Sequence, residues 1–63
     1  MYTLHARVTY EDDNGGVHVE EYVHTTRSIC GGVNFIQERI DTVETRRRWT
    51  CIDVDIFKVD VEV

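Results

Sequence analysis

The residue best suited to chemistry in this 63-residue sequence is Cys30, which is followed directly by Gly31 and Gly32. We predict that a helix begins near this point, and a helix N-terminus stabilises the thiolate that makes cysteine a nucleophile. A nucleophilic cysteine also needs a base beside it, and the sequence offers no obvious one. The two glycines could begin a phosphate-cradling loop, but the lysine that completes such a loop is missing. We therefore predict no catalytic residues, no cofactor and no enzymatic activity.

Histidine is the other residue type that could form a reactive site. His5 and His24 are predicted to lie opposite each other on the open face of a β-hairpin, where they could hold zinc together with a carboxylate. The same face could be a pH-sensitive contact surface, because histidine titrates near neutrality. We favour a third interpretation, a solvated sheet face with polar cross-strand pairs, because no cysteine or histidine pair has the short spacing of a metal knuckle. The sequence thus predicts no metal site.

The hairpin that positions these histidines is predicted from an alternating pattern and a turn signal. Residues 2–10 alternate between apolar and polar side chains, which is typical of a half-buried strand. Asn14-Gly15 favours a two-residue type I′ turn, and a second strand is predicted from Val17 to about Thr26. Such a turn predicts an apolar face with the pairs Tyr10–Val19, Ala6–Val23 and Leu4–Thr25, on which Glu21 opposite Val8 is a misfit. The polar face would carry His5, Arg7, Thr9, Glu11, His18, Glu20, Tyr22 and His24.

A helix is predicted after the hairpin. Ser28 is a suitable N-cap, although the glycines at 31–32 could delay the regular helix to about Val33. One apolar stripe recurs at helical spacing and is predicted to be buried: Ile29, Val33, Ile36, Ile40 and Val43. The arginines at 46–48 would complement the negative end of the helix dipole.

The last segment, Thr50 to Val63, is rich in β-branched residues and is predicted to form one long strand. Its apolar residues change face partway, with Ile52, Val54 and Ile56 on one side and Phe57, Val59, Val61 and Val63 on the other. A β-bulge near Ile56-Phe57 would resolve this change. Otherwise the second half buries its apolar side chains elsewhere, and we predict an oligomer interface made by Phe57, Val59, Val61 and Val63.

Together the elements predict a single domain, residues 1–63, of the α+β class in the order ββαβ. The last strand is expected to pair antiparallel with the first, which has the cleaner alternation. A parallel pairing with the second strand through a right-handed crossover is the alternative. The helix would cover one face of a mainly antiparallel three-stranded sheet and leave the other face open.

Size and charge narrow the possible functions. Domains of this length bury a small core and often need a disulfide, a metal or a second subunit, so we predict a homodimer or a higher homo-oligomer. The net charge of −5 disfavours direct nucleic-acid binding. No apolar run has membrane-spanning length, and the first ten residues lack the apolar core of a signal peptide. We therefore expect a cytoplasmic protein with reduced Cys30 and Cys51 and no membrane contact.

The residues predicted to contact a partner protein lie on the helix and in acidic clusters. Phe35 lies off the buried stripe on the flank of Arg39 and Arg46, and aromatic and arginine side chains are frequent in binding hot spots. Phe35 could equally lap over the core edge, or its flank could form the dimer contact. Trp49 could either join the contact or seal the core. The acidic partners are predicted to be Asp12, Asp13, Glu20, Asp53 and Asp55. The alternative is an oligomer that gathers Arg39, Arg46 and Arg47 from several chains around a phosphate-bearing ligand or nucleic acid.

Four features of the chain occur together: the predicted order ββαβ, the acidic turn Glu11-Asp12-Asp13-Asn14-Gly15, Tyr22 on the second strand and Phe35 on the helix. In this combination the chain resembles the small dimeric uracil-DNA glycosylase inhibitors of phages. The resemblance implies a virus-type inhibitor of a host defence or DNA-processing protein. It also implies that Phe35 enters an apolar pocket of the target, while acidic side chains take the place of DNA phosphates.

Overall fold

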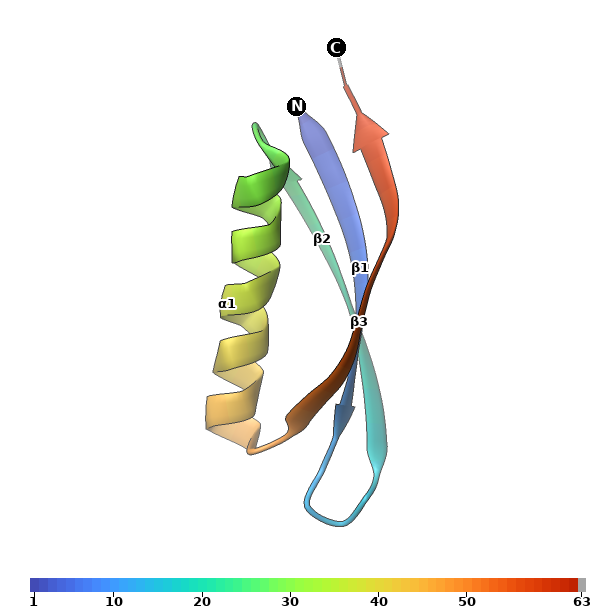
Figure 1. Ribbon diagram of the computed structural model, residues 1–63, viewed down its shortest axis with the longest axis vertical. Helices are drawn as coiled ribbons and strands as arrows, with labels where there is room; N and C mark the ends of the chain where they lie inside the picture. Colours follow the sequence, from blue (N-terminus) through green and yellow to red (C-terminus); the bar gives the residue numbers. More distant parts are fainter. Residues whose placement is uncertain (63) are drawn as a thin grey trace.

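The computed structural model describes residues 1–62, which form three strands and one helix (Figure 1). The elements are β1 (Tyr2–Glu11), β2 (Val17–Thr26), α1 (Ile29–Arg47) and β3 (Thr50–Val61). The sheet has the order β2-β1-β3, and β1 pairs antiparallel with both neighbours. This arrangement confirms the predicted α+β class, the order ββαβ and the central position of the first strand. Among the described residues, no helix has the length and apolar character that crossing a membrane requires.

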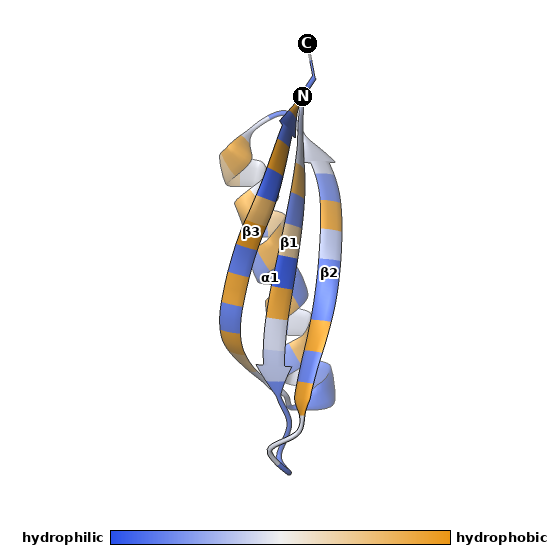
Figure 2. Ribbon diagram, turned by 90° about the vertical axis from the view of Figure 1, so that its right-hand side faces the viewer, coloured by the Kyte–Doolittle hydropathy of each residue, from blue (hydrophilic) through white to orange (hydrophobic). Residues whose placement is uncertain are grey.

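The core lies between α1 and the central strand. α1 runs along one face of the sheet, the helix side, and leaves the other face, the open side, uncovered (Figure 1 and Figure 2). Four side chains of β1 and two of α1 are buried: Leu4, Ala6, Val8, Tyr10, Ile36 and Ile40. The Cα positions extend over 45 × 18 × 12 Å, so the protein is a long, thin pair of layers. Layers this narrow bury few side chains, and much apolar surface stays exposed.

The hairpin register differs by one residue from the register that Asn14-Gly15 predicts. Five residues, 12–16, join β1 to β2 in place of a two-residue turn. The Asp12 carboxylate explains the longer loop, because its Oδ1 accepts the backbone N–H of Asn14 at 2.9 Å and of Gly16 at 2.7 Å. The positive φ of 79° falls on Gly15, where the lack of a Cβ makes it favourable.

This single-residue difference reverses the two faces of β2, because side chains alternate along a strand. The helix side carries His18, Glu20, Tyr22 and His24 opposite the buried residues of β1, and the open side carries Val17, Val19 and Val23. The predicted apolar pairs Tyr10–Val19 and Ala6–Val23 are therefore wrong. Glu21 does not oppose Val8 but pairs with Arg7 on the open side, where Arg7 Nη2 lies 2.9 Å from Glu21 Oε1. The strands alternate between hydrophilic and hydrophobic residues along their length (Figure 2).

α1 begins directly after the predicted N-cap. Ser28 Oγ accepts the backbone N–H of Gly31 at 3.1 Å, and the helix starts at Ile29. This confirms Ser28 as the N-cap and contradicts the later start at Val33. At the other end, Arg48 is the C-cap in the left-handed region with a φ of 57°.

The line of contact between α1 and the sheet differs from the predicted stripe at its N-terminal end. Ile36 and Ile40 are buried and Val43 packs against the core, but Ile29 and Val33 are exposed. The reason is Gly32, which takes the contact position against β1: a Cβ there would lie 2.8 Å from Leu4 Cδ1. Larger neighbouring side chains are thereby turned to the flanks of the helix.

β3 resolves its change of face by irregular pairing. The register with β1 shifts at two places, with Phe57 and Ile52 as the extra residues. The predicted bulge near Ile56-Phe57 is therefore confirmed. It places the exposed Val54, Ile56, Val59 and Val61 together on the helix side, opposite β1 residues of the same face.

Phe57 itself lies on the open side, with its ring centroid 6.0 Å from that of His5 and 4.8 Å from Arg7 Cζ. The prediction that Phe57 shares a face with Val59 and Val61 is therefore wrong, because the bulge returns the following residues to the other face. Val63, predicted as part of the same row, lies outside the described residues.

Candidate functional site

α1 covers β2 through a row of polar and aromatic side chains. His24 stacks on Phe35 with ring centroids 3.9 Å apart, and His18 stacks on Trp49 with centroids 4.0 Å apart. Phe35 and Trp49, which the sequence predicts as partner-contact residues, are half-buried and pack against the core. Phe35 thus laps over the core edge, and Trp49 seals the end of the core where α1 turns into β3.

Between the two stacks, a hydrogen-bonded chain leads from the core to the surface. Tyr22 Oη donates to Glu20 Oε2 at 3.0 Å and therefore accepts from Tyr10 Oη, also at 3.0 Å. Glu20 Oε1 accepts from Arg47 Nη1 at 3.4 Å. Burial raises the pKa of Tyr22 far above its ordinary value, and its hydrogen bonds to Tyr10 and Glu20 raise it further. A tyrosine is protonated near neutral pH even at its ordinary pKa of 10.0, so the Tyr22 hydroxyl donates to the Glu20 carboxylate and holds it in place.

A cleft of about 210 Å³ opens beside this chain, where α1 meets β2. It is lined by Glu20, Tyr22, Arg39, Thr42, Val43, Arg46 and Arg47. The helical members lie on one flank of α1 because their spacings of three and four residues repeat once per turn. The structure thus brings together in one chain the three arginines that the sequence predicts as a group from several chains. We call this site the arginine cleft.

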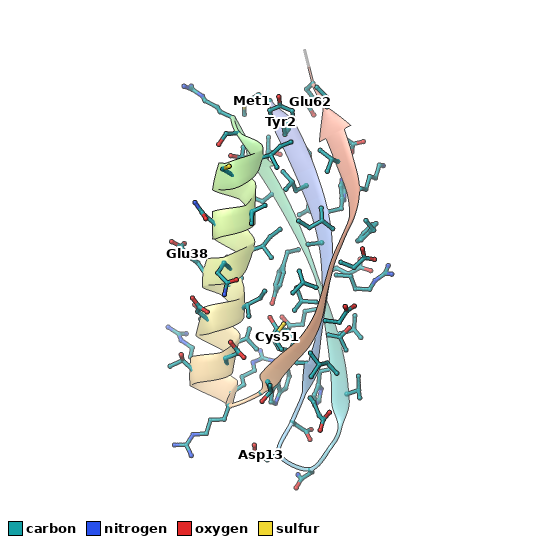
Figure 3. All side chains as sticks on the ribbon, in the orientation of Figure 1. Met1, Tyr2, Asp13, Glu38, Cys51 and Glu62 are labelled. Carbon is teal, nitrogen blue, oxygen red and sulfur yellow. The ribbon has the colours of Figure 1, made fainter. Side chains whose placement is uncertain are left out.

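The hairpin loop is organised by Asp12. Besides the two backbone N–H groups, its carboxylate accepts from His18, whose Nε2 lies 2.8 Å from Asp12 Oδ2. The hydrogen bond from His18, followed by that from Gly16, lowers the pKa of Asp12 below its ordinary value. Asp13, in contrast, is exposed at the tip of the loop (Figure 3).

The lowered pKa of Asp12 predicts that acid weakens the hairpin. A carboxyl group with a lowered folded-state pKa stabilises the fold above its ordinary pKa of 3.8, and this contribution is lost as the pH falls through the folded-state pKa. We expect Asp12→Asn to lower the thermal unfolding midpoint at neutral pH and to change it less at the acidic end of a pH series. Asp13→Asn is the matched control and should follow the wild type throughout. Parallel pH curves for the wild type and Asp12→Asn would contradict this role.

The structure disperses the predicted acidic residues. Asp12 belongs to the loop, Glu20 lies on the helix side beside Arg47, and Asp53 and Asp55 lie on the open side opposite Thr9 and Arg7. Of the five predicted acidic residues, only Asp53 and Asp55 therefore lie next to each other on one exposed strand face.

The helix side of β3 carries an exposed apolar strip, which we call the β3 apolar surface. It consists of Val54, Ile56, Val59 and Val61, whose exposed fractions range from 38% to 66%. Glu44 lies on the flank of α1 that faces β3, because its Oε2 accepts the backbone N–H of Cys51 in β3 at 3.2 Å. Val33 precedes Glu44 by three helical turns, so it lies on the same flank and extends the strip.

The predicted histidine pair is separated. His5 lies on the open side with its Nε2 3.2 Å from Asp60 Oδ2, whereas His24 lies on the helix side under Phe35. The predicted opposition of His5 and His24 is therefore wrong, and the one-residue register difference is the cause. Within residues 1–62, no three His, Cys, Asp or Glu side chains are placed to hold a metal ion.

Both cysteines are free thiols in different surroundings. Cys30 is exposed in the first turn of α1, and Cys51 is half-buried between β3 and the helix (Figure 3). Burial raises the pKa of the Cys51 thiol above its ordinary value. A thiol with a raised pKa is protonated near neutral pH and is a poor nucleophile.

Comparison of the chain with protein-family models, with curated proteins and with solved structures finds no match. We therefore infer the function from two surfaces of the molecule, the arginine cleft and the β3 apolar surface.

The sequence predicts Glu20 as a contact residue, but it does not predict that Glu20, Tyr22 and Val43 lie beside the arginines of the cleft. The signal that could have found them is Asp12 followed by Gly16. An aspartate at that position can accept backbone N–H groups two and four residues later, which specifies a longer loop than Asn14-Gly15 alone.

Proposed function

We propose that this chain is a non-enzymatic binding protein that acts through protein–protein contact as a homodimer. The β3 apolar surface carries the proposal, because one edge of the sheet presents four adjacent apolar side chains to solvent. Contiguous exposed apolar surface of this kind marks interaction sites in small domains. Residues 1–62 bury six core side chains, and so small a core gains stability when a second surface covers that strip.

The partner that covers the β3 apolar surface is a second copy of the chain. β3 is an edge strand, so one side of its backbone is free to pair with a partner strand. The bulge at Phe57 reverses the alternation of side chains midway along β3. In an antiparallel pair with a two-fold axis between Phe57 and Lys58, Ile56 of one copy therefore lies opposite Val59 of the other, and Val54 lies opposite Val61.

The mass of the protein in solution tests this assembly. We expect light scattering after size exclusion to give a dimer across a concentration series. Val59→Asp places a charge in the apolar strip and should give a monomer, because an unpaired charge is costly to bury. Val19→Asp introduces the same change on the open side of β2, at the other edge of the sheet, and should leave the dimer intact. A monomeric wild type, or a Val59→Asp variant that stays dimeric, would contradict the proposal.

The class of target follows from the resemblance to the phage inhibitors, and we propose a host DNA-processing protein. Asp53 and Asp55 on the open side support this part, since adjacent carboxylates on one strand face can occupy the sites of DNA phosphates. The direct test adds the protein in molar excess to purified uracil-DNA glycosylase and measures uracil release. Loss of activity with the wild type, relieved by Asp53→Asn with Asp55→Asn, is the expected result. Full activity would remove this enzyme as the target.

A further inference from the structure

We propose that the arginine cleft binds the phosphate group of a small phosphomonoester. This site lies on the β2 flank of α1, whereas the β3 apolar surface lies on the other flank of the same helix. It therefore goes beyond the proposed function, and neither proposal depends on the other.

The charge of the cleft matches a phosphate dianion. Three guanidinium groups, Arg39, Arg46 and Arg47, face one carboxylate, Glu20, which leaves a formal charge of +2 in a chain of net charge −5. A phosphomonoester carries close to two negative charges near neutral pH. Arginine also presents N–H donors in a planar fork that fits phosphate oxygens in pairs.

Two of the three guanidinium groups are held in place by aromatic rings. Arg39 Cζ lies 5.3 Å from the centre of the Phe35 ring, and Arg47 Cζ lies 4.9 Å from the centre of the Trp49 ring. Phe35 and Trp49 are themselves stacked on His24 and His18 of β2. Side chains ordered in advance lose less entropy on binding, so this arrangement favours a defined ligand.

The guanidinium that remains, that of Arg46, is available for the ligand. Among residues 1–62, Arg39 and Arg46 make no ion pair, and Arg47 shares its contact with Glu20. Tyr22 donates to Glu20 Oε2, which leaves Oε1 of the same carboxylate to accept from Arg47. The cleft thus offers two uncommitted arginines and a third that a phosphate can recruit.

The size of the cleft favours a small ligand over a polymer. Its volume of about 210 Å³ is below the range of roughly 300–1,000 Å³ that is usual for drug-sized ligands. A phosphate with a body the size of a sugar fills such a space. Val43 and the Tyr22 ring form the apolar wall of the cleft that such a body would contact. The Thr42 hydroxyl donates its hydrogen to the Glu38 carbonyl at 2.9 Å, so the arginines are left as the donors to the phosphate.

Titration calorimetry with ribose 5-phosphate, a sugar monophosphate that matches the size of the cleft, with ribose and with inorganic phosphate tests this site on the full chain. We expect the monophosphate and inorganic phosphate to bind and ribose to fail, because only the phosphate meets the arginines. Arg46→Gln should weaken binding of the monophosphate roughly tenfold or more, the effect of losing one charged hydrogen-bonding partner. Arg27→Gln is the matched control, because it makes the same change of charge at an exposed position outside the cleft.

A single-stranded oligonucleotide provides the competing outcome. If it binds with steep salt dependence while the monophosphate and inorganic phosphate do not bind, the small-ligand proposal is overturned. Absence of binding by every phosphate probe, or equal weakening by Arg46→Gln and Arg27→Gln, also overturns it. Val59→Asp should leave phosphate binding unchanged, so failure of the homodimer and failure of the phosphate site are distinguishable.

Discussion

Leu4→Ala is expected to lower the free energy of unfolding by about 2–5 kcal/mol. Leu4 is 1% exposed and fills the contact between β1 and the Gly32 turn of α1. Truncation leaves a cavity that the close helix contact cannot fill by a small movement. A domain of this length has a total stability of roughly 3–9 kcal/mol, so the variant would be close to unfolded. Urea denaturation followed by circular dichroism, at one fixed protein concentration, measures the loss.

Val19→Ala is the control for this prediction and also tests the hairpin register. Val19 is 55% exposed on the open side, so its truncation should change the free energy of unfolding by less than about 0.5 kcal/mol. With a two-residue turn, Val19 would instead face Tyr10 in the core, and its truncation would be costly. Similar losses for Leu4→Ala and Val19→Ala would therefore contradict the five-residue loop.

Trp49→Ala is expected to cost about 3 kcal/mol of stability, the lower end for truncation of an aromatic side chain, because the ring is half-buried. The indole stacks on His18, and its ring centroid lies 5.9 Å from that of Tyr10. It also lies under the guanidinium of Arg47. Thermal unfolding of the purified variant measures the effect.

Trp49→Phe separates this structural role from a role in partner contact. A phenyl ring keeps the stack on His18, so we expect less than half of the loss caused by alanine. If Trp49→Ala unfolds like the wild type, the indole does not seal the core and is free to contact a partner, as one sequence-based interpretation holds. Any binding defect of Trp49→Ala should be compared with Trp49→Phe for this reason.

The sequence by itself determined the elements and most of their arrangement. Alternation in residues 2–10 identified the first strand, Ser28 identified the start of the helix, and the change of face at Ile56-Phe57 indicated the bulge. These features are local, because backbone preferences and hydrogen bonds within a few residues decide them. Antiparallel pairing of the last strand with the first also followed from local pattern, since the first strand has the cleaner alternation.

The face of β2 was decided only by the tertiary structure. Val17–Thr26 contains apolar residues at odd positions and the pair Tyr22 and His24 at even positions, so either face can meet a helix. The choice depends on one residue of loop length, which the Asp12 carboxylate sets through hydrogen bonds to the loop and to His18. Because strand side chains have a period of two, that one residue exchanges the entire buried and exposed sets.

The arginine cleft and the β3 apolar surface were also decided only by the tertiary structure. Helical spacing placed Arg39 and Arg46 on one flank, but their position beside Glu20 and Tyr22 required the correct face of β2. The exposure of Val59 required the narrow contact of α1 through Gly32, which leaves the edge strand uncovered. Local preferences therefore determined which elements form, whereas contacts between residues distant in sequence decided which side chains meet.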